Sequence, residues 1–207
     1  MYRLNLLAFF ALSSFALMAC GTVTDSDNTD PTEPSTEADP SETTEPGNST
    51  EPEPIDYSQL VNPLLVRGVM DGDTFEVLKD GEVVRVRMKG IDTPELSGYN
   101  DQPEPCAENA KQFLWDTIGN SQVDLEFDSS CGDDPYNTCV DSYDRVLAYV
   151  RIYTGEDLAT LILKQGLGQV YRFNNESFDR LAAYNSAEDT AQNNDLGIWD
   201  STGQGCR

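Results

Sequence analysis

The sequence predicts an α+β protein with a mainly β core, a five-stranded OB-like barrel with about three helices. Three consecutive strands are expected at residues 64–70, 74–78 and 83–91. Two further strands are expected at residues 123–127, where apolar residues alternate, and at residues 145–153. Five strands with helices inserted after the third and beyond the fifth are typical of an OB-like barrel.

The turn between the second and third strands predicts how they pair. Residues 79–82 are Lys-Asp-Gly-Glu, and Asp-Gly is a strong signal for a tight hairpin turn. The first three strands are therefore expected to be antiparallel neighbours. Successive side chains of a strand point to opposite faces, which divides residues 84–89 into Val84, Val86 and Met88 on one face and Arg85, Arg87 and Lys89 on the other.

The helices are predicted from apolar residues at helical spacing and from glycines that stop them. They are expected at residues 106–118, 157–165 and 176–194. Loops are expected at residues 96–105 and 128–142, and a short last strand at residues 169–171. Ile198 and Trp199 are expected to fold back onto the body.

The composition excludes several kinds of chemistry. The chain has no histidine, which excludes Ser-His and Cys-His nucleophilic pairs, histidine-dependent nucleases and most zinc enzymes. A general base would have to be a carboxylate, a lysine, a tyrosine or a metal-bound water. The formal charge is −24, of which residues 61–207 carry −14, so any contact with a polyanion is expected to be local.

Residues 1–19 are predicted to be a signal peptide. Arg3 precedes an apolar run from Leu6 to Met18, which is shorter than the ~20 residues that a membrane-spanning helix needs. The run ends at Leu-Met-Ala-Cys, which resembles a bacterial lipobox. Cys20 is therefore expected to carry a lipid and to become the mature N-terminus, with plain secretion as the alternative.

Residues 20–60 are predicted to be a disordered tether. From Gly21 to Leu60 the chain has eleven Asp or Glu residues, no Lys or Arg, and many Thr, Pro and Ser residues. Such a segment cannot bury enough apolar surface to fold, and its charges repel one another. The tether would hold the folded domain, residues 61–207, away from a bacterial membrane, on the cell surface or the periplasmic face.

Two acidic clusters flank the predicted hairpin, Asp71-Gly72-Asp73-Thr74 and Asp92-Thr93-Pro94-Glu95. Carboxylates and backbone carbonyls are the ligands that Ca²⁺ prefers, and a bound divalent cation polarises a phosphoryl oxygen. Asp73 and Asp92 are the natural ligands. Taken alone, the first cluster is more typical of an Asx turn. Arg87 alone is typical of a solvated strand residue, and Arg145 alone of a surface ion pair. The presence of the second acidic cluster at this distance from the first favours a metal site.

The order and spacing of these motifs resemble the staphylococcal-nuclease-like, or thermonuclease, family. The resemblance covers residues 64–199. It rests on the two acidic clusters with Arg87 between them, and on three later motifs: Asp141-Ser142-Tyr143-Asp144-Arg145, Gln165-Gly166-Leu167 and Gly197-Ile198-Trp199. It implies a calcium-dependent nuclease that hydrolyses phosphodiester bonds of DNA and/or RNA and leaves 3′-phosphates.

The resemblance also implies which residues would bind the metal. Asp73 and Asp92 would bind Ca²⁺ through their carboxylates, and Thr93 would bind it through its backbone carbonyl. Asp71 is expected to support these ligands rather than to contact the ion.

Other matched residues would act on the substrate. The resemblance implies that Arg87 and Arg145 grip the scissile phosphate and that Glu95 orients or deprotonates the attacking water. Tyr143 would lie near the terminal phosphate of a bound nucleotide. Tyr171 and Phe173 would either stack on a base or pack in the core.

The sequence departs from the family in charge. Residues 96–105 and Ser142 stand where the best-known enzymes carry lysines that help to hold nucleic acid. Affinity for nucleic acid is therefore expected to be weaker, and to depend less on salt, than in a basic relative.

Four cysteines remain once Cys20 is assigned to the lipid. An even number in an exported chain predicts disulfides, and three pairings are possible. The favoured pairing joins Cys131 to Cys139 and Cys106 to Cys206. The alternative, a metal cluster, fits poorly with the spacing of the cysteines and with the absence of histidine.

Two classes of function follow from these observations. The first is a nuclease tethered outside the cytoplasm, and the second is a noncatalytic nuclease-like module that binds nucleic acid or protein. The presence of Arg87, Glu95 and Arg145 favours the enzyme. The expected partners are a nucleic acid and, through the lipid, a membrane. No obligate protein partner is evident, and a monomer is the default expectation.

Overall fold

The structure is a computed structural model that describes residues 54–97, 101–202 and 205–206. The predicted signal peptide, Cys20 and most of the predicted tether lie outside these residues. In the part that is described, no helix is long and apolar enough to cross a membrane.

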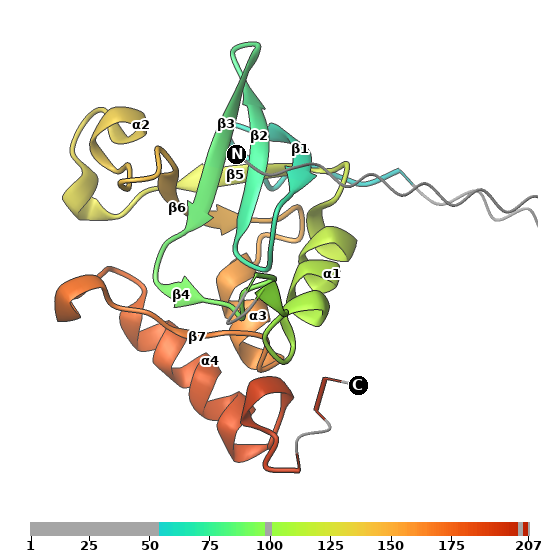
Figure 1. Cartoon of the computed structure of the whole chain (residues 1–207). Coiled ribbons are helices and arrows are strands. Elements are labelled where there is room, and N and C mark those ends of the chain that lie inside the picture. The colour runs from blue at the N-terminus through green and yellow to red at the C-terminus, as the bar shows by residue number, and fades with distance from the viewer. Residues whose placement is uncertain (1–53, 98–100, 203–204, 207) are drawn as a thin grey trace, which may run out of the picture. The chain divides into compact units, whose positions relative to one another are not determined.

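A closed five-stranded barrel forms the centre of the domain, as the sequence predicts (Figure 1). The strands follow one another around the barrel in the order β1-β2-β3-β6-β5. All neighbours are antiparallel except β3 and β6, which are parallel. Their bounds are Leu64–Val69 for β1, Thr74–Lys79 for β2, Glu82–Met88 for β3, Gln122–Glu126 for β5 and Val146–Arg151 for β6.

Alternation along the strands places apolar side chains inside the barrel. Val86 and Met88 are buried, as predicted, whereas Val84 is only half-buried near the hairpin tip. Phe75 and Val77 face them from β2 and are fully buried. Arg87 lies on the opposite face of β3, where the register pairs it with Thr74 at the start of β2.

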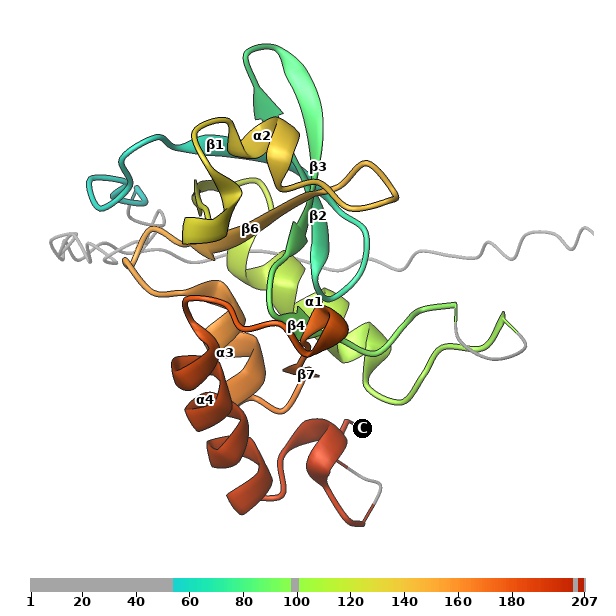
Figure 2. The same cartoon turned by 90° about the vertical axis from the view of Figure 1, so that its left-hand side faces the viewer.

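The described residues contain four α-helices rather than the three expected. They are α1 (Ala107–Ile118), α2 (Pro135–Thr138), α3 (Leu158–Lys164) and α4 (Leu181–Asn193). Three short 3₁₀ helices accompany them: η2 (Ser129–Cys131), η3 (Phe173–Asn175) and η4 (Gly197–Trp199). The additional helix, α2, lies in the predicted loop 128–142. Helices α3 and α4 pack side by side at one end of the barrel (Figure 2).

The predicted strand 83–91 is divided in two. β3 ends at Met88, and Gly90 turns the chain with φ of 87°, a conformation that glycine adopts without steric cost. β4 (Ile91–Asp92) then pairs with β7 (Gln169–Val170) outside the barrel. This turn brings the second acidic cluster back beside the first.

The last helix begins later than predicted, at Leu181 instead of residue 176. Long-range contacts hold the preceding segment in another conformation. The backbone N–H of Asp179 donates to Asp128 Oδ2 over 2.9 Å, and the Asp179 carboxylate accepts hydrogen bonds from Ser129. Phe178 is buried against Tyr184. These contacts outweigh the local helical pattern of the sequence.

The disulfides and the start of the domain complete the fold. The structure joins Cys131 to Cys139 and Cys106 to Cys206, the pairing favoured from the sequence. Leu60 is buried, and the ring of Tyr57 lies edge-on to Tyr153. These last residues of the predicted tether therefore contact the barrel.

Candidate active site

Asp73 is the buried acid at the centre of the site, with only 2% of its surface exposed. It lies just before β2, where its backbone N–H donates to Asp71 Oδ1 over 3.1 Å. Its Oδ2 accepts the backbone N–H of Thr93 at 3.0 Å, and its Oδ1 accepts the hydroxyl of Thr74 at 3.0 Å. The two acidic clusters of the sequence therefore meet directly through Asp73 and Thr93.

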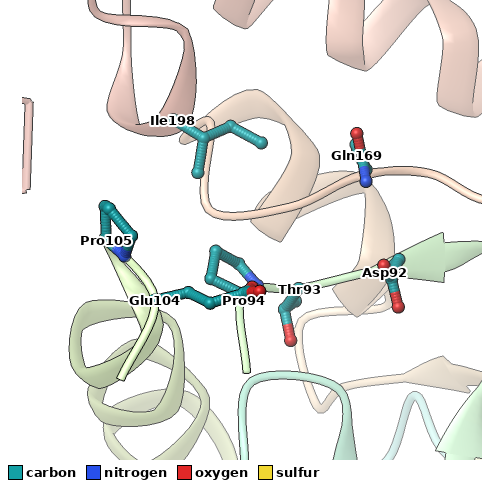
Figure 3. A pocket seen from close by; sticks show the side chains of 7 residues that line it. All are labelled: Asp92, Thr93, Pro94, Glu104, Pro105, Gln169 and Ile198. Carbon is teal, nitrogen blue, oxygen red and sulfur yellow. The ribbon is translucent and has the colours of Figure 1, made fainter. Parts of the chain in front are cut away.

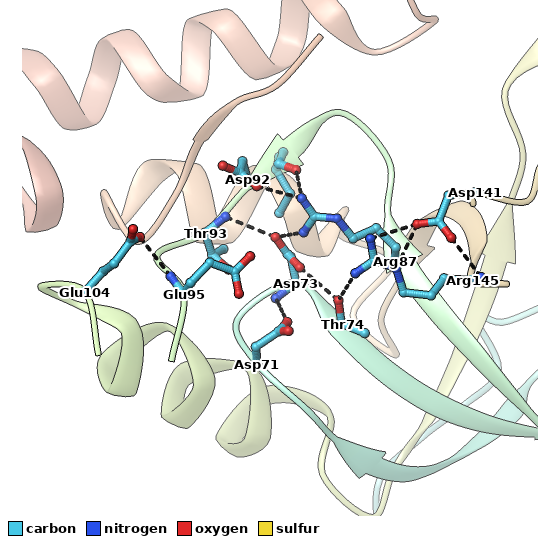
Figure 4. A network of polar contacts seen from close by, with 11 residues as sticks. Asp71, Asp73, Thr74, Arg87, Asp92, Thr93, Glu95, Glu104, Asp141 and Arg145 are labelled. Carbon is cyan, nitrogen blue, oxygen red and sulfur yellow. Dashed lines mark hydrogen bonds and ion pairs between the residues drawn. The ribbon is translucent and has the colours of Figure 1, made fainter. Parts of the chain in front are cut away.

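Arg87 joins the two carboxylates that are predicted to bind the metal. Its guanidinium forms an ion pair with Asp73 through Nη1, and Nη2 lies 2.7 Å from Asp92 Oδ1 (Figure 4). Nη2 also donates to the carbonyl of Ile91 over 3.3 Å. The side chain of Arg87 is 11% exposed, so it neutralises two carboxylates in a largely water-excluded position.

Arg145 reaches the same network from the loop before β6. Its Nε and Nη2 lie 2.8 and 2.7 Å from Asp141 Oδ2, and its Nη1 donates to Thr74 Oγ1 over 3.3 Å. Because the Thr74 hydroxyl also contacts Asp73, which pairs with Arg87, the two predicted phosphate-binding arginines belong to one network. The parallel pairing of β3 with β6 brings their two strands side by side. Figure 4 shows this chain of contacts.

Asp141 is a residue whose role the sequence reasoning missed. Burial alone would raise the pKa of its carboxyl, but hydrogen bonds from the backbone and side chain of Arg145 and from the backbone of Tyr143 outweigh burial and lower the pKa. Asp141 therefore remains an anion that holds one edge of the Arg145 guanidinium. The available signal was its position four residues before Arg145 in the matched motif.

Glu95 lies at the exposed edge of the network and is paired with Glu104. The backbone N–H of Glu95 donates to Glu104 Oε2 over 3.0 Å, and the backbone N–H of Glu104 donates to the Glu95 carbonyl over 2.9 Å. In Figure 4 the Glu95 side chain lies between Glu104 and Asp73. Nothing in the sequence identified Glu104.

The electrostatic surroundings favour Glu95 as a proton acceptor. Partial burial is the largest cause that raises the pKa of its carboxyl, the negative charge of Asp71 adds to it, and Arg87 opposes it. A raised pKa brings a carboxylate closer to the range in which a general base is effective near neutral pH.

The three aromatic side chains singled out in the sequence are exposed. Tyr143 is 73% exposed, with the Arg145 guanidinium 5.3 Å from its ring centroid. Tyr171 and Phe173 are 46% and 64% exposed. The alternative that Tyr171 and Phe173 pack in the core is therefore wrong, and both rings are available to a ligand.

The donor set at Asp73 and Asp92 fits a hard cation. Both carboxylates converge on one positive group, the Arg87 guanidinium, so positive charge is favourable at this point. Among the residues that the structure describes, no three His, Cys, Asp or Glu side chains form a metal cluster. A Ca²⁺ ion here would need backbone carbonyls, such as that of Thr93, and water to complete its six to eight oxygen ligands.

A cavity of about 300 Å³ opens beside this network. Asp92, Thr93 and Pro94 form one wall, and the remaining lining comes from segments that are distant in the sequence (Figure 3). They are Glu104 and Pro105 before α1, Gln169 of β7 and Ile198 of η4.

Comparison with known proteins identifies this arrangement. The sequence profile of the family described as "Staphylococcal nuclease homologue" matches residues 85–201, more than half of the chain. The chain belongs to the staphylococcal nuclease family. The profile match includes Arg87, Asp92, Glu95 and Arg145, whereas Asp73 precedes it and is connected to the site by its contacts with Arg87 and Thr93.

Several curated members of the staphylococcal nuclease family are similar to the chain. It is 31% identical over 199 residues to endonuclease YncB of Bacillus subtilis, an alignment that covers 92% of this chain and 88% of that protein. It is 34% identical over 137 residues to the thermonuclease of Staphylococcus intermedius, covering 66% and 75% of the two chains. It is also 34% identical to the prophage-derived endonuclease YokF of B. subtilis, of which the alignment covers 46%.

Proposed function

We propose that this protein is a calcium-dependent nuclease that hydrolyses phosphodiester bonds of DNA and/or RNA and leaves 3′-phosphates. Membership of the staphylococcal nuclease family and relatives named endonuclease and thermonuclease support nuclease activity. The observation that carries the proposal is one polar network. In it Arg87 pairs with Asp73 and Asp92, and Thr74 links Asp73 to Arg145.

Arg87 and Arg145 are suited to stabilise the phosphoryl group during its transfer. Negative charge gathers on the phosphoryl oxygens in the transition state, and a guanidinium presents paired N–H donors that match such oxygens. Asp141 holds the Nε and Nη2 edge of Arg145. Its longer contact with Thr74, through Nη1, leaves that nitrogen as the donor most easily turned toward a phosphate.

Asp73, Asp92 and the backbone carbonyl of Thr93 are the groups that would hold Ca²⁺, with Asp71 supporting Asp73 through a backbone hydrogen bond. When bound, the ion would polarise a phosphoryl oxygen and lower the pKa of a coordinated water. Arg87 neutralises both carboxylates in this structure. With that task taken over by a cation, its donors would be free for the phosphate.

Glu95 would act on the attacking water, either by orienting it or by accepting its proton. Its raised pKa supports this role, since a stronger base takes a proton more readily. Tyr143 would lie near the terminal phosphate of a bound nucleotide, and Tyr171 would stack on a base. The exposure of both rings supports contact with substrate.

The proposed location is outside the cytoplasm, at a bacterial membrane. It is supported by the apolar run before Cys20 and by the acidic composition of residues 20–60. The lipid on Cys20 would anchor the chain, and the acidic segment would separate the nuclease domain from the anionic membrane surface.

Cleavage of single-stranded DNA by the purified protein tests this function. The assay compares calcium with a chelator, and the wild type with Glu95→Ala and Arg87→Ala. Calcium-dependent cutting that falls roughly a hundredfold or more in both variants is expected, the scale of losing one transition-state contact. A folded wild-type protein that binds calcium and nucleic acid without cutting would favour a noncatalytic binding module.

A further inference from the structure

We infer that the disulfide between Cys106 and Cys206 positions Glu95 through Glu104, so that full nuclease activity requires the oxidised protein. This inference rests on the proposed function, and it concerns how the activity of the same site depends on oxidation of the disulfide. Glu104 is a positioning residue, because it contacts Glu95 rather than substrate.

The first link is the pairing of Glu95 with Glu104. Their two hydrogen bonds are reciprocal, from the backbone N–H of Glu95 to the Glu104 carboxylate and from the backbone N–H of Glu104 to the Glu95 carbonyl. Glu95 is otherwise at an exposed edge of the network. Because these bonds fix the backbone from which the Glu95 side chain projects, the position of its carboxylate depends on where Glu104 is held.

The second link is the N-cap of α1, two residues after Glu104. Cys106 occupies the N-cap position with φ of 74°, a left-handed conformation that is uncommon for a residue other than glycine. Among the described residues, no side chain caps this helix terminus. Capping side chains normally fix the first turn of a helix. Here the backbone N–H of Ala107 donates to the Glu104 carbonyl over 3.1 Å, and the covalent bond of Cys106 is a second constraint on the same turn.

The third link anchors the disulfide to the body of the protein. The backbone N–H of Ile198 donates to the carbonyl of Gly166 over 2.8 Å, so η4 lies against the end of α3. Gly205 lies against η4 in turn, since a Cβ atom on it would be 2.6 Å from the Gly197 carbonyl oxygen. Cys206 follows directly and is tied in this way to a helical part of the fold.

The cavity beside the site gives independent support. Pro105, next to Cys106, and Ile198, in η4, line the same cavity as Asp92 and Pro94 (Figure 3). The disulfide therefore connects the segment before α1 with the C-terminal segment that includes η4, and both segments help to line this cavity. Its loss would allow both to move beside the predicted metal ligands.

Reduction of the disulfide between Cys106 and Cys206 would remove this constraint. A dithiol such as dithiothreitol transfers two electrons and two protons, the S–S bond of Cys106 and Cys206 breaks to give two thiols, and the dithiol closes to a cyclic disulfide. An exported protein acquires its disulfides outside the cytoplasm. The nuclease would accordingly be weak before export and fully active after it.

The second disulfide provides a matched control. The full-length chain is compared with Cys106→Ser/Cys206→Ser and with Cys131→Ser/Cys139→Ser, and kcat and KM for single-stranded DNA are measured with saturating calcium. We expect the first variant to lose roughly tenfold or more in kcat, with KM changed less than twofold, because small displacements of a catalytic group slow the reaction strongly. The second variant is expected to keep nearly the wild-type kcat. Although Cys139 precedes Asp141 by two residues, backbone hydrogen bonds from Leu147 to Cys139 and from Asp141 to Arg145 hold that loop against β6 without the disulfide.

Reduction separates the two disulfides further. Dithiothreitol is expected to lower kcat in the wild type and in Cys131→Ser/Cys139→Ser, and to leave the already slow Cys106→Ser/Cys206→Ser unchanged. Equal kcat for both double variants, below their unfolding temperatures, would overturn the inference. So would an equal response of both variants to the reductant.

Variants of Glu104 test the intermediate step. Glu104→Gln keeps an oxygen that accepts the Glu95 N–H and is expected to keep most of the activity, whereas Glu104→Ala is expected to resemble the loss of the disulfide. Hydrogen–deuterium exchange at the Glu95 amide should rise in Glu104→Ala and in Cys106→Ser/Cys206→Ser alone. Unchanged hydrogen–deuterium exchange at the Glu95 amide in both variants would refute the constraint, whether or not the wild type cleaves nucleic acid. Absence of cleavage by the wild type would refute the proposed nuclease separately.

Discussion

Arg87 and Asp73 form an ion pair that is almost closed to water, with side chains that are 11% and 3% exposed. The pair lies between β2 and β3, and Asp92 shares the same guanidinium. Because Asp73 is buried, its negative charge needs a positive partner in every state of the folded protein. In this structure Arg87 is that partner, and in the proposed mechanism a cation takes its place.

Replacement of Arg87 should therefore make stability depend on calcium. Arg87→Gln leaves Asp73 buried and unpaired, and loss of one partner of a buried ion pair costs about 3 to 5 kcal/mol. Urea unfolding without calcium should show a loss of this order. Added calcium should restore more stability to Arg87→Gln than to the wild type, since binding to the folded state alone stabilises it.

Arg85→Gln is the matched control, because Arg85 is on the exposed part of the same strand. Its stability is expected to stay within about 0.5 kcal/mol of the wild type. If calcium raised the free energy of unfolding equally in the wild type, Arg87→Gln and Arg85→Gln, Asp73 would not need either Arg87 or a cation as its partner. That result would contradict the prediction.

Asp141 should act on cleavage only through Arg145. Asp141→Asn is expected to lower kcat/KM by roughly tenfold, because a weaker partner holds the guanidinium, and Arg145→Ala by roughly a hundredfold or more. The double variant should be no slower than Arg145→Ala, since residues that act as a unit are not additive. Steady-state kinetics of the wild type, the two single variants and the double variant give a double-mutant cycle. Additive losses of kcat/KM would show that Asp141 has a role separate from Arg145.

The barrel could be predicted from the sequence because its signals are local. Alternation in β3 and the Asp-Gly turn are contained within a few residues, and the turn residues Asp80 and Gly81 have φ of 52° and 87°, as this type of hairpin requires. The start of α4 could not be predicted in the same way. It is set by contacts of Phe178 and Asp179 with residues far away in the sequence.

The same distinction applies to the site. The acidic clusters and arginines were found because their types and order suggest chemistry, and the structure brings Asp73, Arg87, Asp92 and Thr93 into contact. Glu104 gave no signal, because its pairing with Glu95 depends on how the chain returns to α1. Supporting residues of this kind are defined by tertiary structure alone.

Asp128 should make the stability of the fold depend on pH. Burial would raise the pKa of this carboxyl, but hydrogen bonds from Ser130, Tyr149 and the backbone of Asp179 outweigh burial and lower it well below its usual range. A carboxyl with a lowered folded pKa stabilises the protein above its unfolded pKa of about 3.9, and this contribution is lost as the pH falls further.

Asp128→Asn should therefore be less stable than the wild type at pH 7, and the difference should shrink between about pH 4 and pH 2. Urea unfolding at several pH values measures it, with Asp133→Asn as an exposed control in the same loop. A difference between wild type and Asp128→Asn that stays constant down to pH 2 would contradict the stabilised carboxylate.

Binding of nucleic acid should depend only weakly on salt. In the proposed mechanism the site offers two cations to phosphates, Arg87 and Arg145, and residues 61–207 carry −14 in total. For single strands the slope of log K against log salt is about −0.7 for each phosphate contact, so a slope of about −1 to −2 is expected for an inactive Glu95→Gln protein. Ser142→Lys, at an exposed position beside Tyr143, should steepen the slope by about 0.7. Fluorescence anisotropy over a salt series measures both slopes. A slope steeper than about −4 for Glu95→Gln would require phosphate contacts beyond this site, because two arginines release too few counterions to produce it.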